Sequence, residues 1–391
     1  MEALLPLVCV TCACFQSADD HISRFIDGLR RDETHHCLHT ITSSISPYSE
    51  VGRYNNPQGD FEMTLYNIVA STSEATVVAE CPPNPYRSDS YQSEADLERE
   101  FIKQLEAQGY EFIQIHGEST LVNNLRVQLE ALNHISFTDA EWQRFFGEKI
   151  ANAREGITEK TRKIQDDYVQ ILRRDDGTDQ NIYLIDKRNI HNNRLQVLNQ
   201  YEATEGKHAS RYDVTILVNG FPMVHVELKR RGVALREAFN QINRYHRESF
   251  WSGSGLFDYV QLFIISNGTH TKYYSNTTRQ KHLDDQKPDS IPSGKKGSHS
   301  FEFTNFWATI DNQPITDLVD FTGTFFAKHT LLNILTRYCV FNAQNELLVM
   351  RPYQIAATER ILNRILTSSN AHKTGTLEAG GYIWHTTGSG K

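Results

Sequence analysis

The sequence predicts an α/β domain of roughly 200 residues within the 391-residue chain. Three observations predict it. A helical stretch at 93–109 leads into a short apolar run, two β-branched runs within 211–232 are joined by Asn-Gly, and a helical stretch at 232–250 precedes the apolar run 259–266. This order of helix, antiparallel strands, helix and strand indicates a sheet flanked by helices.

The first helix carries signals at both ends. Ser93, with Asp96 three residues on, predicts a capping box, and Gly109 ends the helix before a strand expected over 110–115. The apolar residues at helical spacing are Leu97, Phe101 and Leu105. Order is therefore expected to begin at this helix, and the preceding Pro- and Ser-rich stretch 81–90 reads as a linker.

The elements that follow are predicted from periodicity and turn residues. Helical spacing returns over the charge-rich residues 126–174, most clearly at 137–150. The strands expected next are 181–186, the hairpin within 211–232, 259–266 and, after Asn267-Gly268, 269–276. A polar loop is expected over 277–300, then helical stretches at 317–338 and from Pro352 onward, and last the strand-like beginning of 380–391.

Composition narrows the class of protein. No run approaches the roughly 20 apolar residues that a membrane span requires, so no membrane role is expected. The net charge of −8 gives no hint of nucleic acid, although a local basic groove can act against an acidic average. The six cysteines form no paired metal-binding pattern, which favours a reduced, cytoplasmic protein. The apolar N-terminus lacks the basic residues and cleavage site of a signal peptide.

The cluster His35, His36, Cys37 and His39 is a candidate zinc site. No second ligand pair follows at a workable distance, which favours a solvated polar segment.

The hairpin gathers polar residues on one face. Because side chains alternate along a strand, one face is apolar. Its members are Tyr212, Val214, Ile216, Val218, Val224, Val226 and Leu228. The opposite face collects Asp213, Thr215, His225, Glu227 and Lys229.

The register of this hairpin decides whether the two carboxylates meet. A two-residue Asn219-Gly220 turn with no irregularity pairs Val218 with Phe221 and puts Asp213 on the opposite side of the sheet from Glu227. We therefore predict either a loop of odd length, such as a three-residue turn with Gly220 in the left-handed conformation, or a β-bulge nearby.

Two carboxylates that converge on one strand face suit a hard divalent cation such as Mg²⁺. An adjacent ammonium such as that of Lys229 can orient a water nucleophile or stabilise negative charge on a phosphate. The alternative, a solvated face whose charges form weak pairs, is equally compatible with the spacing alone.

The stretch YDVTILVNG…VHVELKRRG resembles the PD-(D/E)xK nuclease core, which implies a mixed sheet flanked by helices. Its Asp and Glu-x-Lys pattern is matched by Asp213, Glu227 and Lys229, with Tyr212 where Pro is usual. The resemblance implies that Asp213 and Glu227 hold Mg²⁺ and that Lys229 assists the attacking water.

Two helices carry further candidates. Gln241 and Tyr245, one turn apart, resemble the Q-x-x-x-Y pair that supports DNA cleavage in one branch of these nucleases, the alternative being an ordinary surface pair. Glu98 in the first helix resembles the acidic residue that many of them add to the metal site, and Glu94 is its rival.

The C-terminal segment resembles the start of a nucleotide-driven motor. HTTGSGK is similar to a phosphate-binding loop, in which Thr387, Gly388, Ser389, Gly390 and Lys391 approach phosphates. RPYQIAATERI resembles the Q motif of superfamily 2 helicases, which implies that Arg351, Tyr353 and Gln354 contact the adenine of ATP.

The order of nuclease, Q motif and phosphate loop resembles the restriction (R) subunit of type I restriction-modification enzymes, nearest the IC class, over about 91–391. The resemblance implies an ATP-dependent endonuclease that acts on double-stranded DNA with methyltransferase and specificity subunits. The expected divisions are an N-terminal extension and linker over 1–88, the nuclease over 89–320, and the start of the first RecA-like motor domain over 321–391.

The sequence departs from that family at both ends. Motor motifs beyond Lys391 are absent, so ATP-driven translocation is not expected of this chain alone. Residues 1–62 match nothing in the pattern, and Met63 is a candidate start site. The alternatives left open are a truncated remnant that folds and at most binds DNA weakly, and a self-contained nuclease without type I partners.

Overall fold

A computed structural model of the chain describes residues 67–68, 79–80, 92–115, 117–203, 210–248, 253–277, 304–309 and 312–383. Of residues 67–68, 79–80, 202–203, 210–211 and 243–248 it describes the backbone alone. Everything below refers to the compact unit formed by the described residues between 65 and 379. The His/Cys cluster at 35–39 and Met63 lie outside the described residues.

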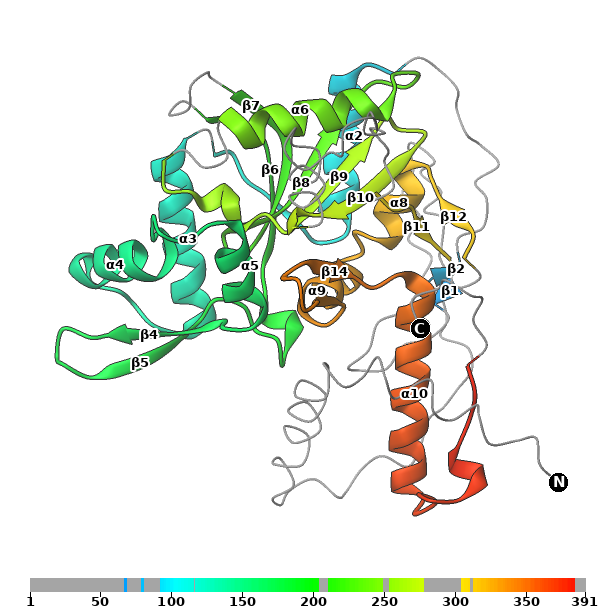
Figure 1. Ribbon diagram of the computed structural model, residues 1–391. Helices are drawn as coiled ribbons and strands as arrows, with labels where there is room; N and C mark the ends of the chain where they lie inside the picture. The colour runs from blue at the N-terminus through cyan, green and yellow to red at the C-terminus, as the bar shows by residue number, and fades with distance from the viewer. Residues whose placement is uncertain are drawn as a thin grey trace, which may run out of the picture. The chain divides into compact units, whose positions relative to one another are not determined.

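A six-stranded mixed sheet forms the centre of the unit, in the order β10-β9-β8-β7-β6-β3 (Figure 1). Its strands are β3 (Glu111–Phe112), β6 (Leu195–Ala203), β7 (Ser210–Val218), β8 (Phe221–Leu228), β9 (Leu262–Ser266) and β10 (Thr271–Ser275). Neighbours β6, β7 and β8 run antiparallel, as do β9 and β10, whereas β3 pairs with β6 and β8 with β9 in parallel. The predicted sheet flanked by helices is confirmed.

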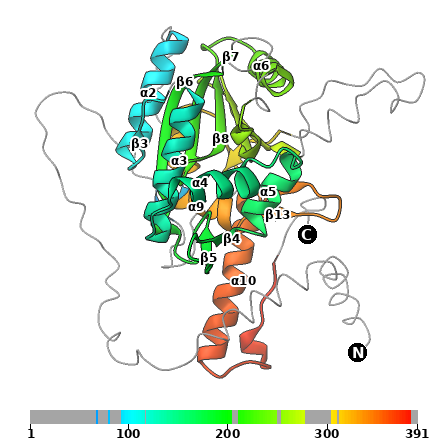
Figure 2. The same ribbon diagram turned by 90° about the vertical axis from the view of Figure 1, so that its left-hand side faces the viewer.

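Helices cover both sides of the sheet. Figures 1 and 2 show α2 (Glu94–Ala107) and α6 (Leu235–Glu248) on opposite sides of it. On the α2 side, Phe101 packs against Phe326, which follows α8 (Leu318–Thr324). On the α6 side, Phe239 contacts Tyr274 of β10. Because α6 links the parallel strands β8 and β9, it has the position expected of a crossover helix.

The remaining elements are helices around the sheet and short two-stranded ribbons. The helical elements are α3 (Glu118–Asn133), α4 (Asp139–Phe145), the π-turn Phe146–Ile150, α5 (Ile157–Gln165), the 3-10 turns Ile190–Asn192, Leu256–Tyr259 and Leu377–Ala379, α9 (Lys328–Thr336) and α10 (Pro352–Asn370). The ribbons are β1 (Asn67–Ile68) with β2 (Ala79–Glu80), β4 (Val169–Arg173) with β5 (Asp179–Tyr183), β11 (Trp307–Ala308) with β12 (Pro314–Ile315), and β13 (Cys339–Phe341) with β14 (Leu347–Val349). Among the described residues, no helix combines the length and apolar character needed to cross a membrane.

Several predicted elements are confirmed. The side chain of Ser93 accepts a hydrogen bond from the backbone N–H of Asp96, so α2 begins at the predicted cap. α10 begins at Pro352, as the position of that proline predicts. The Asn267-Gly268 turn joins β9 and β10 as expected.

Other predictions are wrong in part. β4 lies within the stretch predicted to be helical to residue 174. The expected strand 259–266 begins only at Leu262, because residues 256–259 form a 3-10 turn, and the helical stretch 317–338 is two helices, α8 and α9. The expected domain boundary near residue 320 falls inside α8, and that division stays a prediction.

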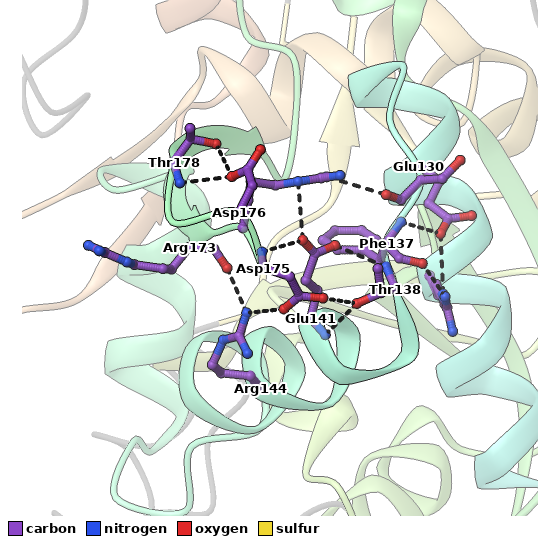
Figure 3. Close-up of polar contacts among 12 residues, drawn as sticks. Glu130, Phe137, Thr138, Glu141, Arg144, Arg173, Asp175, Asp176 and Thr178 are labelled. Atoms are coloured by element: carbon purple, nitrogen blue, oxygen red, sulfur yellow. Dashed lines mark hydrogen bonds and ion pairs between the residues drawn. The ribbon is translucent and has the colours of Figure 1, made fainter.

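The β4–β5 hairpin is held against α4 by a buried carboxylate (Figure 3). Glu141 accepts hydrogen bonds from the backbone N–H groups of Thr138 and Asp175, at 2.9 Å each. It also forms an ion pair with Arg174, whose Nε lies 3.2 Å from Glu141 Oε1. Glu141 therefore joins the first turn of α4 to the turn of a hairpin more than thirty residues further along the chain.

Candidate nuclease site

The turn between β7 and β8 sets the register of the two strands. Val218 pairs with Phe221, so the turn has two residues, and both have positive φ angles, 51° at Asn219 and 84° at Gly220. These angles define a type I′ turn. The predicted left-handed conformation of Gly220 is therefore confirmed, while the three-residue loop offered as an example does not occur.

A β-bulge follows this turn, as the alternative prediction required. Leu217 pairs with Pro222 but Ile216 pairs with Val224, which leaves Met223 as an extra residue on β8. Beyond the bulge, Val214 faces Val226. One step further along the ladder, Asp213 and Glu227 lie opposite each other on one face.

Asp213, Glu227 and Lys229 form a compact charged group. The Lys229 ammonium lies 3.0 Å from Glu227 Oε1 and 4.0 Å from Asp213 Oδ2. Asp213 Oδ2 also accepts a hydrogen bond from the backbone N–H of Leu228 at 3.0 Å. The structure therefore brings the three residues predicted from the motif into mutual contact, which rules out the solvated-face alternative because Glu227 is fully buried.

The positive charge near Asp213 and Glu227 is too small to offset the burial of their carboxylates. Burial, with the nearby charge of Glu227, raises the pKa of Asp213 to about 8. Burial likewise raises the pKa of Glu227 to about 7, against the opposing effect of Lys229. The pKa of Lys229 is raised, because the two carboxylates outweigh the effect of its burial. One ammonium thus faces two carboxylates, and a further cation would stabilise their ionised forms.

These residues fit a hard divalent cation. Glu227 Oε2 is buried and makes no hydrogen bond to any described residue, with His225 Nε2 3.5 Å away, which leaves it able to accept a cation. Asp213 and Glu227 would offer carboxylate oxygens to it, and no group of three or more His, Cys, Asp or Glu side chains suited to a metal occurs in the described part of the chain. Two are sufficient for Mg²⁺, which keeps several waters in most protein sites.

Helix α2 brings both candidate glutamates to this region. Glu94 Oε1 lies 3.2 Å from Lys229 Nζ. Glu98 is buried, and its two oxygens accept hydrogen bonds from the side chains of Asn199 and Gln200 at 2.5 Å each. Because Gln200 and Asp213 face each other between the pairs Asn199–Val214 and Tyr201–Tyr212, Glu98 lies one side chain away from the strand position of Asp213.

Helix α6 covers the face that carries Glu227. His225 pairs with Phe263 of β9, Phe263 stacks on Tyr274, and Tyr274 contacts Phe239 of α6. Glu227 is two residues from His225 on the same strand and so shares this face. Gln241 is half-buried on α6, and Tyr245 is in the same helix, although its side chain lies outside what is described.

The predicted nucleotide contacts are described only in part. Gln354 accepts a hydrogen bond from the backbone N–H of Arg351 at 2.8 Å and so caps α10. Arg351 is exposed and Tyr353 half-buried. Residues 387–391, with the predicted phosphate contacts of Thr387, Gly388, Ser389, Gly390 and Lys391, lie outside the described residues.

Sequence reasoning missed the contribution of β6. Asn199 and Gln200, which hold Glu98, lie on a strand that was not predicted, since its polar residues interrupt any apolar alternation. The unusual positive φ of Gln200, 54°, also has no sequence signal.

Comparison with known proteins identifies relatives of the chain. Residues 91–282 match the family model described as type I restriction enzyme R protein N terminus. The chain is 50% identical over 311 residues to the type I restriction enzyme EcoprrI endonuclease subunit of Escherichia coli, which covers 78% of this chain and 94% of the relative. It is 38% identical over 307 residues to the SsaAORF53P endonuclease subunit of Staphylococcus saprophyticus, covering 77% of this chain but 29% of the relative.

A more distant relative comes from an archaeon. The putative type I restriction enzyme MjaIXP endonuclease subunit of Methanocaldococcus jannaschii is 24% identical over 222 residues, or 54% of this chain and 20% of the relative. The chain thus spans nearly all of the E. coli relative and less than a third of the staphylococcal one. The range matched by the family model contains Asp213, Glu227 and Lys229.

Proposed function

Because this chain belongs to the endonuclease (R) subunits of type I restriction enzymes, we propose that its Asp213, Glu227 and Lys229 hydrolyse phosphodiester bonds of double-stranded DNA with Mg²⁺. The observation that carries the proposal is the meeting of a fully buried and a half-buried carboxylate across neighbouring strands, with a lysine ammonium 3.0 Å from the buried one. Each of the three residues has a separate task in it.

Asp213 and Glu227 would hold the cation through their carboxylate oxygens. When bound, Mg²⁺ supplies a Lewis acid beside the phosphate and offsets negative charge in the site. The backbone N–H of Leu228 keeps Asp213 Oδ2 in place.

Lys229 would act on the water and the phosphate. Its ammonium already donates to Glu227 Oε1 and to the Leu228 carbonyl, at 3.0 and 2.9 Å, which fixes its position at the end of β8. From there it orients the attacking water and stabilises negative charge that develops on the phosphate oxygens. Gln241 and Tyr245, on the helix over the same face, would support cleavage, and Glu98 or Glu94 would supplement the metal site.

We further propose that Arg351, Tyr353, Gln354 and residues 387–391 contribute to binding ATP and that the segment from residue 321 begins a RecA-like motor. Methyltransferase and specificity subunits would recognise the target, so no residue here is expected to read bases. The polar contacts proposed for this chain are therefore with the DNA backbone.

A nicking assay tests the proposal. Supercoiled plasmid is incubated with the full chain and Mg²⁺, in parallel with Asp213→Asn and with the matched control Asp179→Asn, whose side chain is 58% exposed on the β4–β5 hairpin. Nicking by the wild type and by Asp179→Asn, but not by Asp213→Asn, is the expected result. Equal activity in the wild type and both variants would refute the proposed site. No activity in any of the three proteins would favour the alternative of a truncated remnant that at most binds DNA weakly.

A further inference from the structure

A buried histidine connects the central strand pair to the candidate metal ligand. His225 lies on β8, fully buried, two residues before Glu227. Its Nδ1 lies 3.3 Å from Thr215 Oγ1 on β7, and its Nε2 lies 3.5 Å from Glu227 Oε2. The two ring nitrogens therefore face two different polar groups, one on each strand.

Aromatic neighbours fix the orientation of this imidazole. The rings of Tyr212 and Phe263 approach it edge-on, with centroids at 5.6 and 6.3 Å. A ring packed in this way cannot turn freely without displacing both neighbours. The positions of Nδ1 and Nε2 relative to Thr215 and Glu227 are thus set by the core.

Hydrogen-bond chemistry assigns a direction to this chain of groups. A neutral imidazole has one donor and one acceptor nitrogen. A Thr hydroxyl can donate to Nδ1, which leaves the proton on Nε2, facing the carboxylate oxygen. When a bound cation holds Glu227 in its ionised form, the other tautomer would direct a lone pair of Nε2 at the carboxylate in a buried site, which is unfavourable.

We propose that His225 is a positioning residue: in the Nε2–H form, held by Thr215, it directs its N–H at Glu227 Oε2, 3.5 Å away, and fixes the plane of the carboxylate for cation binding. The inference rests on the function proposed for Asp213 and Glu227. Lys229 Nζ holds the other oxygen, Oε1, at 3.0 Å, so the two oxygens of Glu227 are oriented from opposite ends. Each oxygen keeps a second lone pair with which to bind the cation.

The role proposed for His225 sets the expected loss of metal affinity when it is replaced. Outer partners that orient a metal ligand typically contribute about 10- to 100-fold in metal affinity. His225→Phe fills the aromatic enclosure but removes both nitrogens, so Mn²⁺ should bind about 10- to 100-fold more weakly. His225→Gln can place its side-chain N–H near the position of Nε2, and we expect it to restore affinity to within about 3-fold of the wild type.

Calorimetric titration of the full chain with Mn²⁺ measures these affinities, with unfolding midpoints to show that each variant is folded. Weak binding by His225→Phe with recovery in His225→Gln supports the inference, whereas wild-type affinity in a folded His225→Phe overturns it. The variant Asp213→Asn distinguishes a failure of the proposed function from a failure of the role of His225 alone. If Asp213→Asn binds Mn²⁺ normally, the proposed function fails; if it loses binding while His225→Phe does not, only the role of His225 fails.

Nitrogen-15 spectra of the histidine-labelled chain in Mg²⁺ give a readout independent of metal affinity and still decide the matter if His225→Phe does not fold. The signals of His225 are assigned by their loss in His225→Gln. A proton on Nε2 supports the inference, and a proton on Nδ1 alone overturns it. Thr215→Val, which removes the donor to Nδ1, should shift the proton distribution between the two nitrogens and weaken Mn²⁺ binding.

Discussion

Replacing Gly220 by alanine tests how closely the β7–β8 turn packs against α3. Gly220 has a φ of 84°, and a Cβ built on it would lie 2.6 Å from Leu125 Cα and 3.2 Å from Leu125 Cδ1. The left-handed conformation costs a residue with a Cβ about 1–2 kcal/mol, and forcing extra volume into a packed site costs about 1–3 kcal/mol more. We therefore expect Gly220→Ala to lower the free energy of unfolding by about 2–5 kcal/mol.

Gly177 provides a matched control for the backbone contribution. Its φ is also 84°, but a Cβ there would meet no atom within 4 Å. Gly177→Ala should therefore lose only the conformational part, about 1–2 kcal/mol. Since the entropy that alanine removes from the unfolded chain is common to both variants, the difference between them isolates the contact with Leu125.

Urea unfolding of the two variants measures this difference. Because the nearest atom to the added Cβ belongs to the backbone of α3, the additional substitution Leu125→Ala should not restore stability. Equal midpoints for Gly220→Ala and Gly177→Ala would refute the reasoning. So would rescue by Leu125→Ala, which would locate the conflict in a side chain instead of in the approach of two backbones.

Two further predictions concern charged side chains. Burial lowers the pKa of Lys187 from 10.5 to about 8, so between these pH values the unfolded chain binds more protons than the folded chain and stability rises with pH. Between pH 8 and 9 the free energy of unfolding of the wild type should rise by about 1 kcal/mol relative to that of Lys187→Met. Urea unfolding that gives the same pH dependence for both proteins would contradict this. For the rival glutamates, we expect Glu94→Gln to weaken Mn²⁺ binding more than Glu98→Gln does, because both oxygens of Glu98 already accept amide hydrogen bonds. Calorimetric titration checks the order, and the reverse order would identify Glu98 as the supplementary ligand.

The features that the sequence revealed depend on local signals. The caps of α2 and α10 and the Asn-Gly turns act within a few residues, so they can be recognised without knowledge of the fold. The need for a bulge followed from parity alone: Asp213 and Glu227 could share a face only if one residue was added between them. Local signals and counting thus predicted the register that brings Asp213 and Glu227 to one face.

The features that were missed depend on distant neighbours. β6 is a strand because β7 and β3 pair with both its edges, and its own polar residues give no alternation. The burial of both faces of β8 likewise comes from helices on either side, and alternation predicts only one buried face. For the same reason the contacts of Glu98 with Asn199 and Gln200 required the fold to be known.

The cost of burying Glu227 explains the arrangement around it. A buried carboxylate is unfavourable unless it is paired and hydrogen-bonded, and here one ammonium serves both Glu227 and Asp213. Apolar residues on the opposite face of β8, of which Val224, Val226 and Leu228 are fully buried, supply the stability that this pair does not. A strand that is apolar on one face can therefore retain, on its other face, carboxylates whose negative charge is not fully balanced. This unbalanced negative charge is the property that would draw a divalent cation to the site.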